Sequence, residues 1–175
     1  ARHPEHRLYY WDQRLIATDF PGEFLALFWT HDLLERKDLN VHLSHARLEA
    51  NSIVGEPVRA TSVPGQIAAP MWLDDGTLLA FVVDRSRPGT LTLWVSSDGG
   101  NTWPPAQRLL IHEHNEQARL SQGSENIDFK QYWEDMGKWS FGHPAIRLLP
   151  DGKILLAYYA GTPDRMSTHW VRVSI

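Results

Sequence analysis

The sequence predicts an all-β fold in which about three antiparallel sheets are arranged as the blades of a β-propeller. The first observation is a repeat, because a turn glycine that leads directly into an apolar strand occurs at residues 22–29, 76–83 and 152–159. The second is that a strand candidate precedes each of these segments, as in a β-hairpin, at residues 8–16, 66–73 and 143–149. The third is that another strand candidate follows each one after a polar loop, at residues 40–48, 90–96 and 167–174. Repeated antiparallel meanders with turn residues between them are typical of propeller blades.

The repeats divide the chain into three blades and one insertion within a single domain, residues 1–175. The approximate blades are residues 7–57, 65–111 and 141–175, and the second one includes a fourth strand at residues 108–111. The rest, residues 112–140, is the insertion. Because the chain begins with Ala1 rather than Met and a strand follows almost at once, we interpret it as a piece of a longer protein.

The insertion contains one pattern that indicates a short helix. Phe129, Trp133 and Met136 are spaced as i, i+4 and i+7, and Gly137 suits a helix end. We therefore expect a helix near residues 128–136, with Glu134 and Asp135 pointing away from the apolar stripe. Paired carboxylates perform glycoside hydrolysis, so these two acids are candidate catalytic residues, with solvated acids on an exposed helix as the alternative.

The composition narrows the range of partners. The formal net charge is only −4, which gives no broad electrostatic attraction to nucleic acid or to an anionic membrane. No apolar run reaches the 18 residues or more that a membrane-spanning helix needs. The absence of cysteine excludes a thiol nucleophile, and His112 and His114 without a third ligand do not predict a metal site. We expect neither nucleic acid nor membrane as a partner, and no cofactor.

One segment, SSDGGNTW at residues 96–103, contains the residue types that are common in tight turns between strands. Glycine accepts positive φ at little cost, and an Asp side chain accepts hydrogen bonds from nearby backbone N–H groups. The turn falls between the third and fourth strands of the second blade. Its equivalent in the first blade keeps only the serine, and the third blade ends before it. We therefore interpret its key residues as structural: Ser96, Asp98, Gly100, Thr102 and Trp103.

The same turn carries a family resemblance. Its pattern, Ser-x-Asp-x-Gly-x-Thr-Trp, resembles the Asp box of the BNR repeats in sialidase-superfamily propellers. Further segments look like parts of such proteins: residues 9–14, 64–66, 73–79, 141–144 and 149–152. The resemblance implies six blades, so this chain would be the C-terminal half. It also implies that the loops between strands two and three, and between blades, share the site face, with Asp boxes at the opposite face.

The loops assigned to the site face by this resemblance contain arginines. Arg36, Arg85 and Arg165 are candidates for binding a substrate carboxylate, because a guanidinium can grip a carboxylate bidentately. Arginine in a polar hairpin loop is alternatively just solvated. Sialidases read the substrate with an arginine triad, but the positions that match one of its motifs hold Ala68 and Gly142 here. Such arginines would have to come from the missing half.

The inner strands begin with polar or aromatic side chains that would converge near the propeller axis. We predict substrate binding by Trp11, Gln13 and Gln66, and acid or base catalysis by Asp12 and His143. A plain structural role for each of them stays open.

Three functions compete at this stage. The first is a sialidase-like, exo-acting glycoside hydrolase for an acidic or neutral sugar. The second is a non-catalytic carbohydrate-binding propeller, in which tryptophan and tyrosine stack on sugar rings. The third is a structural interaction module without a ligand. Because half a propeller would expose the apolar faces of its end blades, we also predict self-association or pairing with the missing N-terminal half.

Overall fold

The computed structural model describes residues 5–86, 88–115 and 129–175. Within these ranges the chain forms three antiparallel sheets, of six, four and three strands, and one α-helix. This confirms the predicted all-β fold with three antiparallel sheets and a short helix. The described sheets do not close into a ring, so the propeller arrangement stays a prediction.

The first sheet contains strands β1 to β6. Its main path runs β1 (Leu8–Ala17), β2 (Glu23–Asp32), β4 (His42–Glu49) and β5 (Ser52–Gly55). Two short strands lie off this path: β3 (Lys37–Asp38) pairs with β2, and β6 (Arg59–Ala60) pairs with β4.

The second sheet is a four-stranded meander in the order β10-β9-β8-β7. Its strands are β7 (Ile67–Trp72), β8 (Leu78–Asp84), β9 (Gly89–Ser96) and β10 (Arg108–His114). A short 3-10 helix, Pro105–Gln107, precedes β10. The last strand continues to His114, three residues beyond its predicted end, because residues 112–114 keep pairing with β9.

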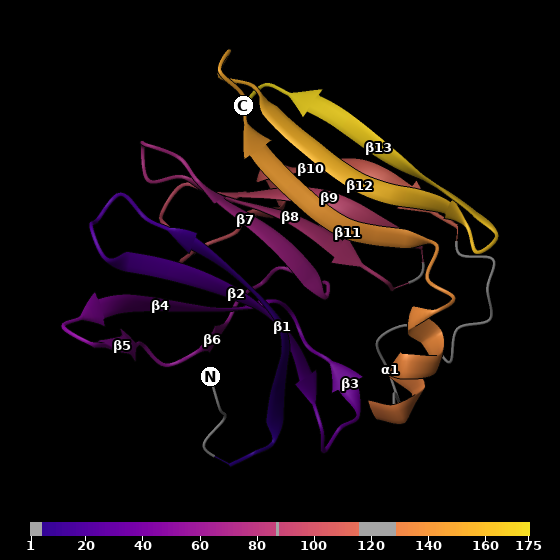
Figure 1. Ribbon diagram of the computed structural model, residues 1–175, viewed down its shortest axis with the longest axis horizontal. Helices are drawn as coiled ribbons and strands as arrows, with labels where there is room; N and C mark the ends of the chain where they lie inside the picture. The colour runs from indigo at the N-terminus through magenta and orange to yellow at the C-terminus, as the bar shows by residue number, and fades with distance from the viewer. Residues whose placement is uncertain (1–4, 87, 116–128) are drawn as a thin grey trace.

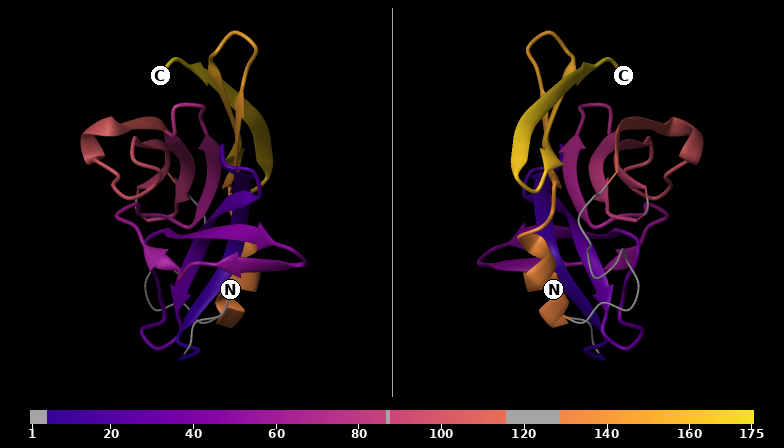
Figure 2. Two further views of the ribbon diagram at one scale, coloured as in Figure 1. Left: turned by 90° about the vertical axis from the view of Figure 1, so that its left-hand side faces the viewer. Right: turned by 90° about the vertical axis from the view of Figure 1, so that its right-hand side faces the viewer.

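The third sheet consists of β11 (Phe141–Leu148), β12 (Ile154–Thr162) and β13 (Arg165–Val173). Helix α1, Phe129–Met136, precedes it and agrees with the predicted helix at residues 128–136. The helix lies beside the first sheet although it is close in sequence to the third (Figure 2). In the described part of the chain, no helix has the length and apolar character that crossing a membrane requires.

The three sheets lie next to one another, with the second between the other two (Figure 1). Strand β7 contacts β1 and β2 on one side and β11 on the other. One buried core joins the first and second sheets and includes Leu27, Leu43 and Trp103. A second core joins the second and third sheets and includes Phe81, Leu91 and Leu156. The second sheet is therefore covered on both faces, which agrees with the almost completely buried β8.

Candidate functional site

Residues from all three sheets meet at one cavity of about 400 Å³, which we call the tryptophan cavity. The first sheet supplies side chains from β1 and β2, the second supplies the start of β7 and the residue after β8, and the third supplies β11 and β12. The end of α1 and the segment after it complete the wall. The lining residues are Trp11, Asp12, Arg14, Trp29, Ile67, Arg85, Met136, Trp139, His143 and Tyr159.

Two β-bulges aim side chains into this cavity. In β1 the register shifts between Tyr10 and Gln13, so that Trp11 and Asp12 together face one position of β2. In β11 it shifts between residues 142 and 145, and the bulge contains His143 with a positive φ of 54°. A bulge changes the direction in which a strand presents its side chains. The two residues predicted to be catalytic on the inner strands, Asp12 and His143, thus both line this cavity from a β-bulge.

Four tryptophans form a connected group at the cavity. The ring centroids of Trp11 and Trp29 lie 5.6 Å apart, and those of Trp29 and Trp139 lie 6.1 Å apart. Trp133 of α1 extends the group, with its ring 5.7 Å from that of Trp11 and its side chain 64% exposed. Such rings offer flat apolar faces with a polar N–H at one edge.

A buried polar group fixes one of these rings. The indole Nε1 of Trp29 donates a hydrogen bond to Oδ1 of Asp38 at 3.0 Å. The same carboxylate oxygen lies 3.0 Å from Nδ1 of His31, and both side chains are almost fully buried. Asp38, which belongs to β3 of the first sheet, therefore fixes the position of the Trp29 ring.

Arg85 is the predicted site-face arginine that reaches the cavity. Its guanidinium carbon lies 3.9 Å from the centroid of the Trp139 ring, and its Nη2 donates to the carbonyl oxygen of Phe141 at 3.4 Å. Gln66 accepts a hydrogen bond from the backbone N–H of Arg85 at 2.8 Å, through Oε1. Gln66 is itself 2% exposed and does not line the cavity. It fixes the loop that presents Arg85.

A glycine gives Arg85 its space. Gly142 has a φ of 145°, and a Cβ built there would lie 2.7 Å from Nη2 of Arg85. The residue therefore cannot carry a side chain while the guanidinium keeps this position.

The cavity contains one carboxylate among its lining side chains, that of Asp12. Nε of Arg14 donates to Oδ1 of Asp12 at 3.2 Å, and both side chains are partly exposed. The lining side chains therefore include two guanidinium groups, those of Arg14 and Arg85, and one carboxylate, that of Asp12. His143 is exposed and lies at the same wall.

Five further predicted site residues lie outside the cavity lining. Gln13 is exposed on β1, Arg36 is exposed in the turn after β2, and Arg165 is exposed at the start of β13. Of the two helix acids, Glu134 is exposed, whereas Asp135 is 4% exposed and forms an ion pair with Lys138 at 3.4 Å. The two carboxylates therefore do not face a common space as a catalytic pair would.

Sequence reasoning did not select several of the lining residues. Trp29 was only a member of an apolar strand, and Trp139 carried no periodic signal in the insertion. Their role depends on contacts between distant segments. The high tryptophan content was the one available signal, and it did not say which rings would meet.

The turn at residues 96–103, for which we keep the label Asp box, forms a closed set of hydrogen bonds between β9 and β10. Oδ1 of Asp98 accepts from the hydroxyl of Ser96 at 2.7 Å and from the backbone N–H of Thr102 at 2.8 Å, and Oδ2 accepts from the Thr102 hydroxyl. These bonds, led by that of the Thr102 hydroxyl, lower the pKa of Asp98 to about 2. Trp103 is 3% exposed and belongs to the core between the first two sheets.

Gly100 shows how closely this turn packs. Its φ is 91°, and a Cβ there would lie 2.6 Å from Cδ1 of Leu43 in the first sheet. Arg59 of β6 donates to the Gly100 carbonyl oxygen at 3.0 Å. The turn thus joins two sheets, and its residues do not line the tryptophan cavity.

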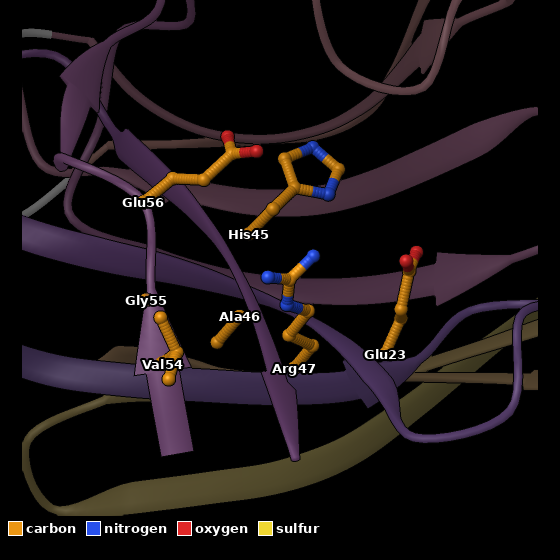
Figure 3. Close-up of a pocket in the computed structure, with 7 residues that line it drawn as sticks. All are labelled: Glu23, His45, Ala46, Arg47, Val54, Gly55 and Glu56. Atoms are coloured by element: carbon orange, nitrogen blue, oxygen red, sulfur yellow. The ribbon is translucent and has the colours of Figure 1, made fainter. Parts of the chain in front are cut away.

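A second hollow of about 290 Å³ lies on the first sheet, along β4 and β5 (Figure 3). Polar and charged side chains surround it: Glu56 and His45 lie at one end, and Arg47 and Glu23 at the other (Figure 3). Arg47 is held in an ion pair by Glu49. Its lining residues include no tryptophan, tyrosine or phenylalanine, in contrast to those of the tryptophan cavity.

A comparison with family models and with curated proteins gives no match. Among solved structures, the chain is similar to the crystal structure of a protein of unknown function from Dyadobacter fermentans DSM 18053. The TM-score is 0.55 at 16% sequence identity, and the match covers 98% of this chain and 52% of that one. The chain thus spans about half the length of this structural relative, and the likeness concerns the fold. In the described ranges, no group of three or more acidic or histidine side chains has an arrangement that could hold a metal ion.

Proposed function

We propose that this chain is part of a sialidase-like β-propeller that binds a glycan carrying a carboxylate in the tryptophan cavity. One observation carries the proposal. Aromatic rings from two sheets and from the segment after α1 surround the same hollow as Arg85, Asp12 and His143. The predictions for these three polar residues came from separate segments of the sequence, and the structure brings them to one place.

The chemistry of the wall fits a sugar. The faces of Trp11, Trp29 and Trp139 can stack on the C–H face of a pyranose ring, and Asp12 and His143 can bond to hydroxyl groups. Arg85 supplies a planar donor fork for a carboxylate. A volume of about 400 Å³ lies at the lower end of the usual range for ligand sites, roughly 300–1,000 Å³. We therefore propose a small sugar acid, or the terminal residue of an acidic glycan, as the ligand.

Calorimetric titration with matched sugars tests this proposal. D-galacturonate and D-galactose differ mainly by the carboxylate, and N-acetylneuraminate tests the larger class of sugar acids. We expect the acids to bind and galactose to bind at least about tenfold more weakly, since a charge-assisted hydrogen bond contributes about 1.5–3 kcal/mol. Equal affinity for galacturonate and galactose would show that Arg85 does not bind the carboxylate. If no sugar bound, the proposal would be contradicted.

A glycoside hydrolase is the second candidate function. The observation that favours it is that Asp12 and His143 line the same cavity, from bulges on opposite sides. A carboxylate and an imidazole can share acid and base roles in bond cleavage. Release of nitrophenol from aryl glycosides and aryl sialosides is the assay. Asp12→Asn and His143→Gln should abolish turnover, whereas Glu134→Gln, outside the cavity, should not change it.

The propeller proposal includes the partner that would complete the fold. Support comes from the meeting of β1 and β11 with β7, and from a structural relative about twice as long. At one end of the set, β13 carries Trp170 and Met166, which are 67% and 50% exposed. We propose that the outer face of the third sheet packs against a second copy when this chain is alone, or against the missing N-terminal half in the whole protein.

Light scattering at micromolar concentration tests this partner. We expect a species of about twice the monomer mass of 20.0 kDa, and a return to monomer in Trp170→Glu. Leu34→Glu is the matched control, because Leu34 is also exposed, at 75%, but lies in the turn after β2. A soluble monomer that does not associate would contradict the half-propeller proposal.

A further inference from the structure

Three histidines from β10 and β13 lie in contact with one another, and we call them the histidine cluster: His112, His114 and His169. Nε2 of His112 lies 3.3 Å from Nδ1 of His114, its neighbour on β10. The ring of His112 stacks on that of His169 from β13, with centroids 6.4 Å apart. The rings of His112 and His169 also lie 5.3 and 5.4 Å from that of Tyr158 on β12.

The cluster is connected to the cavity wall through His114. This residue is 7% exposed, and its Nε2 lies 2.7 Å from the hydroxyl oxygen of Ser140. Its ring stacks on Phe141, with centroids 4.5 Å apart. Ser140 and Phe141 directly follow Trp139, whose ring lies against Arg85, and Phe141 supplies the carbonyl oxygen that Arg85 binds. His114 therefore holds the segment on which the position of Arg85 depends.

Protonation changes what this cluster can do. When both rings are neutral, one of the two facing nitrogens can donate a hydrogen bond to the other, in whichever direction the tautomers allow. When both rings are protonated, each of these nitrogens carries a hydrogen, so neither can accept and the bond is lost. Two adjacent imidazolium ions then also repel each other in a partly buried place.

We infer that the histidine cluster is a proton-sensitive support that positions Trp139 and Arg85, and that it releases them as the pH falls. His114 is a positioning residue in this scheme, since it acts through the segment 139–141. As regulation of ligand binding, the inference rests on the function proposed above for the tryptophan cavity. As a change in structure, it stands without a ligand.

The surroundings of His112 agree with this inference. Burial, and then the nearby His114 and His169, lower the pKa of His112 from its ordinary value of 6.5. Among the described residues, the titratable groups that face it are these two histidines and Tyr158. Arg85 lies beyond Phe141, with its guanidinium carbon 5.7 Å from the centroid of the Phe141 ring. Because the folded-state pKa is depressed, the unfolded chain binds more protons, and stability is lost as the pH falls below about 6.5.

The test uses the Hε proton of Arg85, observed by NMR on the full chain in the presence of a chelator. A guanidinium 3.9 Å from the Trp139 ring centroid is shifted upfield by the ring current. We expect this shift at pH 7.5 and its loss toward about pH 5 in the wild type, below the ordinary histidine pKa of about 6.5, because the pKa of His112 is lowered.

His112→Gln is the decisive variant. Its amide can still bond to His114 but does not titrate, so the Arg85 shift should persist at the lower pH. His45→Gln is the matched control, since His45 lies on β4 outside the cluster, and it should lose the shift as the wild type does. A shift that is equal at both pH values in the wild type, or lost at the lower pH in His112→Gln, would overturn the inference.

The affinity for D-galacturonate gives the second readout. It should fall over the same pH range in the wild type and stay level in His112→Gln. Absence of binding at every pH would count against the proposed function alone, because the Arg85 signal is measured without a ligand.

Discussion

The Asp box and the tryptophan cavity are built from similar residues, but their polar side chains point differently: into the turn itself in the Asp box, and into a shared hollow at the cavity. Each combines tryptophan, a carboxylate and glycines with positive φ near strand ends. In the Asp box, the carboxylate of Asp98 is saturated by its own turn and Trp103 is buried. At the cavity, bulges and a loop turn the side chains toward a shared hollow. Residue type alone therefore does not separate a structural corner from a candidate site; the direction of the polar groups does.

The largest expected effect is on the structural side of this comparison. Trp103→Ala should lower the free energy of unfolding by about 3–5 kcal/mol, because it leaves a large cavity between the first two sheets. Leu34→Ala is the control: Leu34 is 75% exposed in the turn after β2, so its loss should change stability by no more than about 0.5 kcal/mol. Chemical denaturation measures both. Similar losses for the two variants would mean that the box is not the anchor described here.

The next effect concerns the cavity. Arg85→Lys keeps the charge but loses the planar donor fork, and we expect the affinity for D-galacturonate to fall about tenfold or more. Arg165→Lys is the matched control on an exposed arginine outside the cavity, and its affinity should equal that of the wild type. Titration calorimetry compares them. A loss in the control as large as that in Arg85→Lys would shift the site away from the cavity.

Asp98→Ala should have a smaller effect on stability than Trp103→Ala. The turn loses the acceptor for two hydroxyls and one backbone N–H, and with the turn exposed we expect a cost of about 1 kcal/mol. The melting temperature should fall while sugar affinity stays unchanged. An unchanged melting temperature with lost binding would contradict the structural role of the box.

The smallest effect is the acid dependence of the same carboxylate. Its folded-state pKa of about 2 lies below the ordinary 3.8, so the group stabilises the fold above about pH 4, and this contribution disappears as the pH falls toward 2. Denaturation of the wild type and of Asp98→Ala across this range should therefore give converging stabilities at low pH. A constant difference between the two would show that Asp98 does not act through its charge.

Local patterns were sufficient to predict the long strands of each sheet and the helix, whereas the short strands β3, β5 and β6 of the first sheet were not predicted. A turn glycine followed by an apolar run is decided by neighbouring residues, so all three hairpins and α1 could be placed within a few residues. The end of β10 was missed, because His112 and His114 pair with β9 without an apolar pattern of their own.

The cavity was predictable only in part. Asp12 and His143 were selected as residues expected where inner strands begin, whereas the structure places them inside β1 and β11, at bulges that leave no mark in the alternation of residues. Arg36, Arg85 and Arg165 looked equivalent in polar loops. Only Arg85 follows a strand of the middle sheet, where the other two sheets and Trp139 reach it. Such long-range meetings depend on packing between segments and cannot be read from local sequence.

One paired titration tests the division between corner and site most directly. D-galacturonate is titrated into Asp98→Ala and into Arg85→Lys, at a temperature where both variants are fully folded. We expect wild-type affinity for Asp98→Ala and a loss of about tenfold or more for Arg85→Lys. The reverse pattern, with binding lost in Asp98→Ala and kept in Arg85→Lys, would contradict this division.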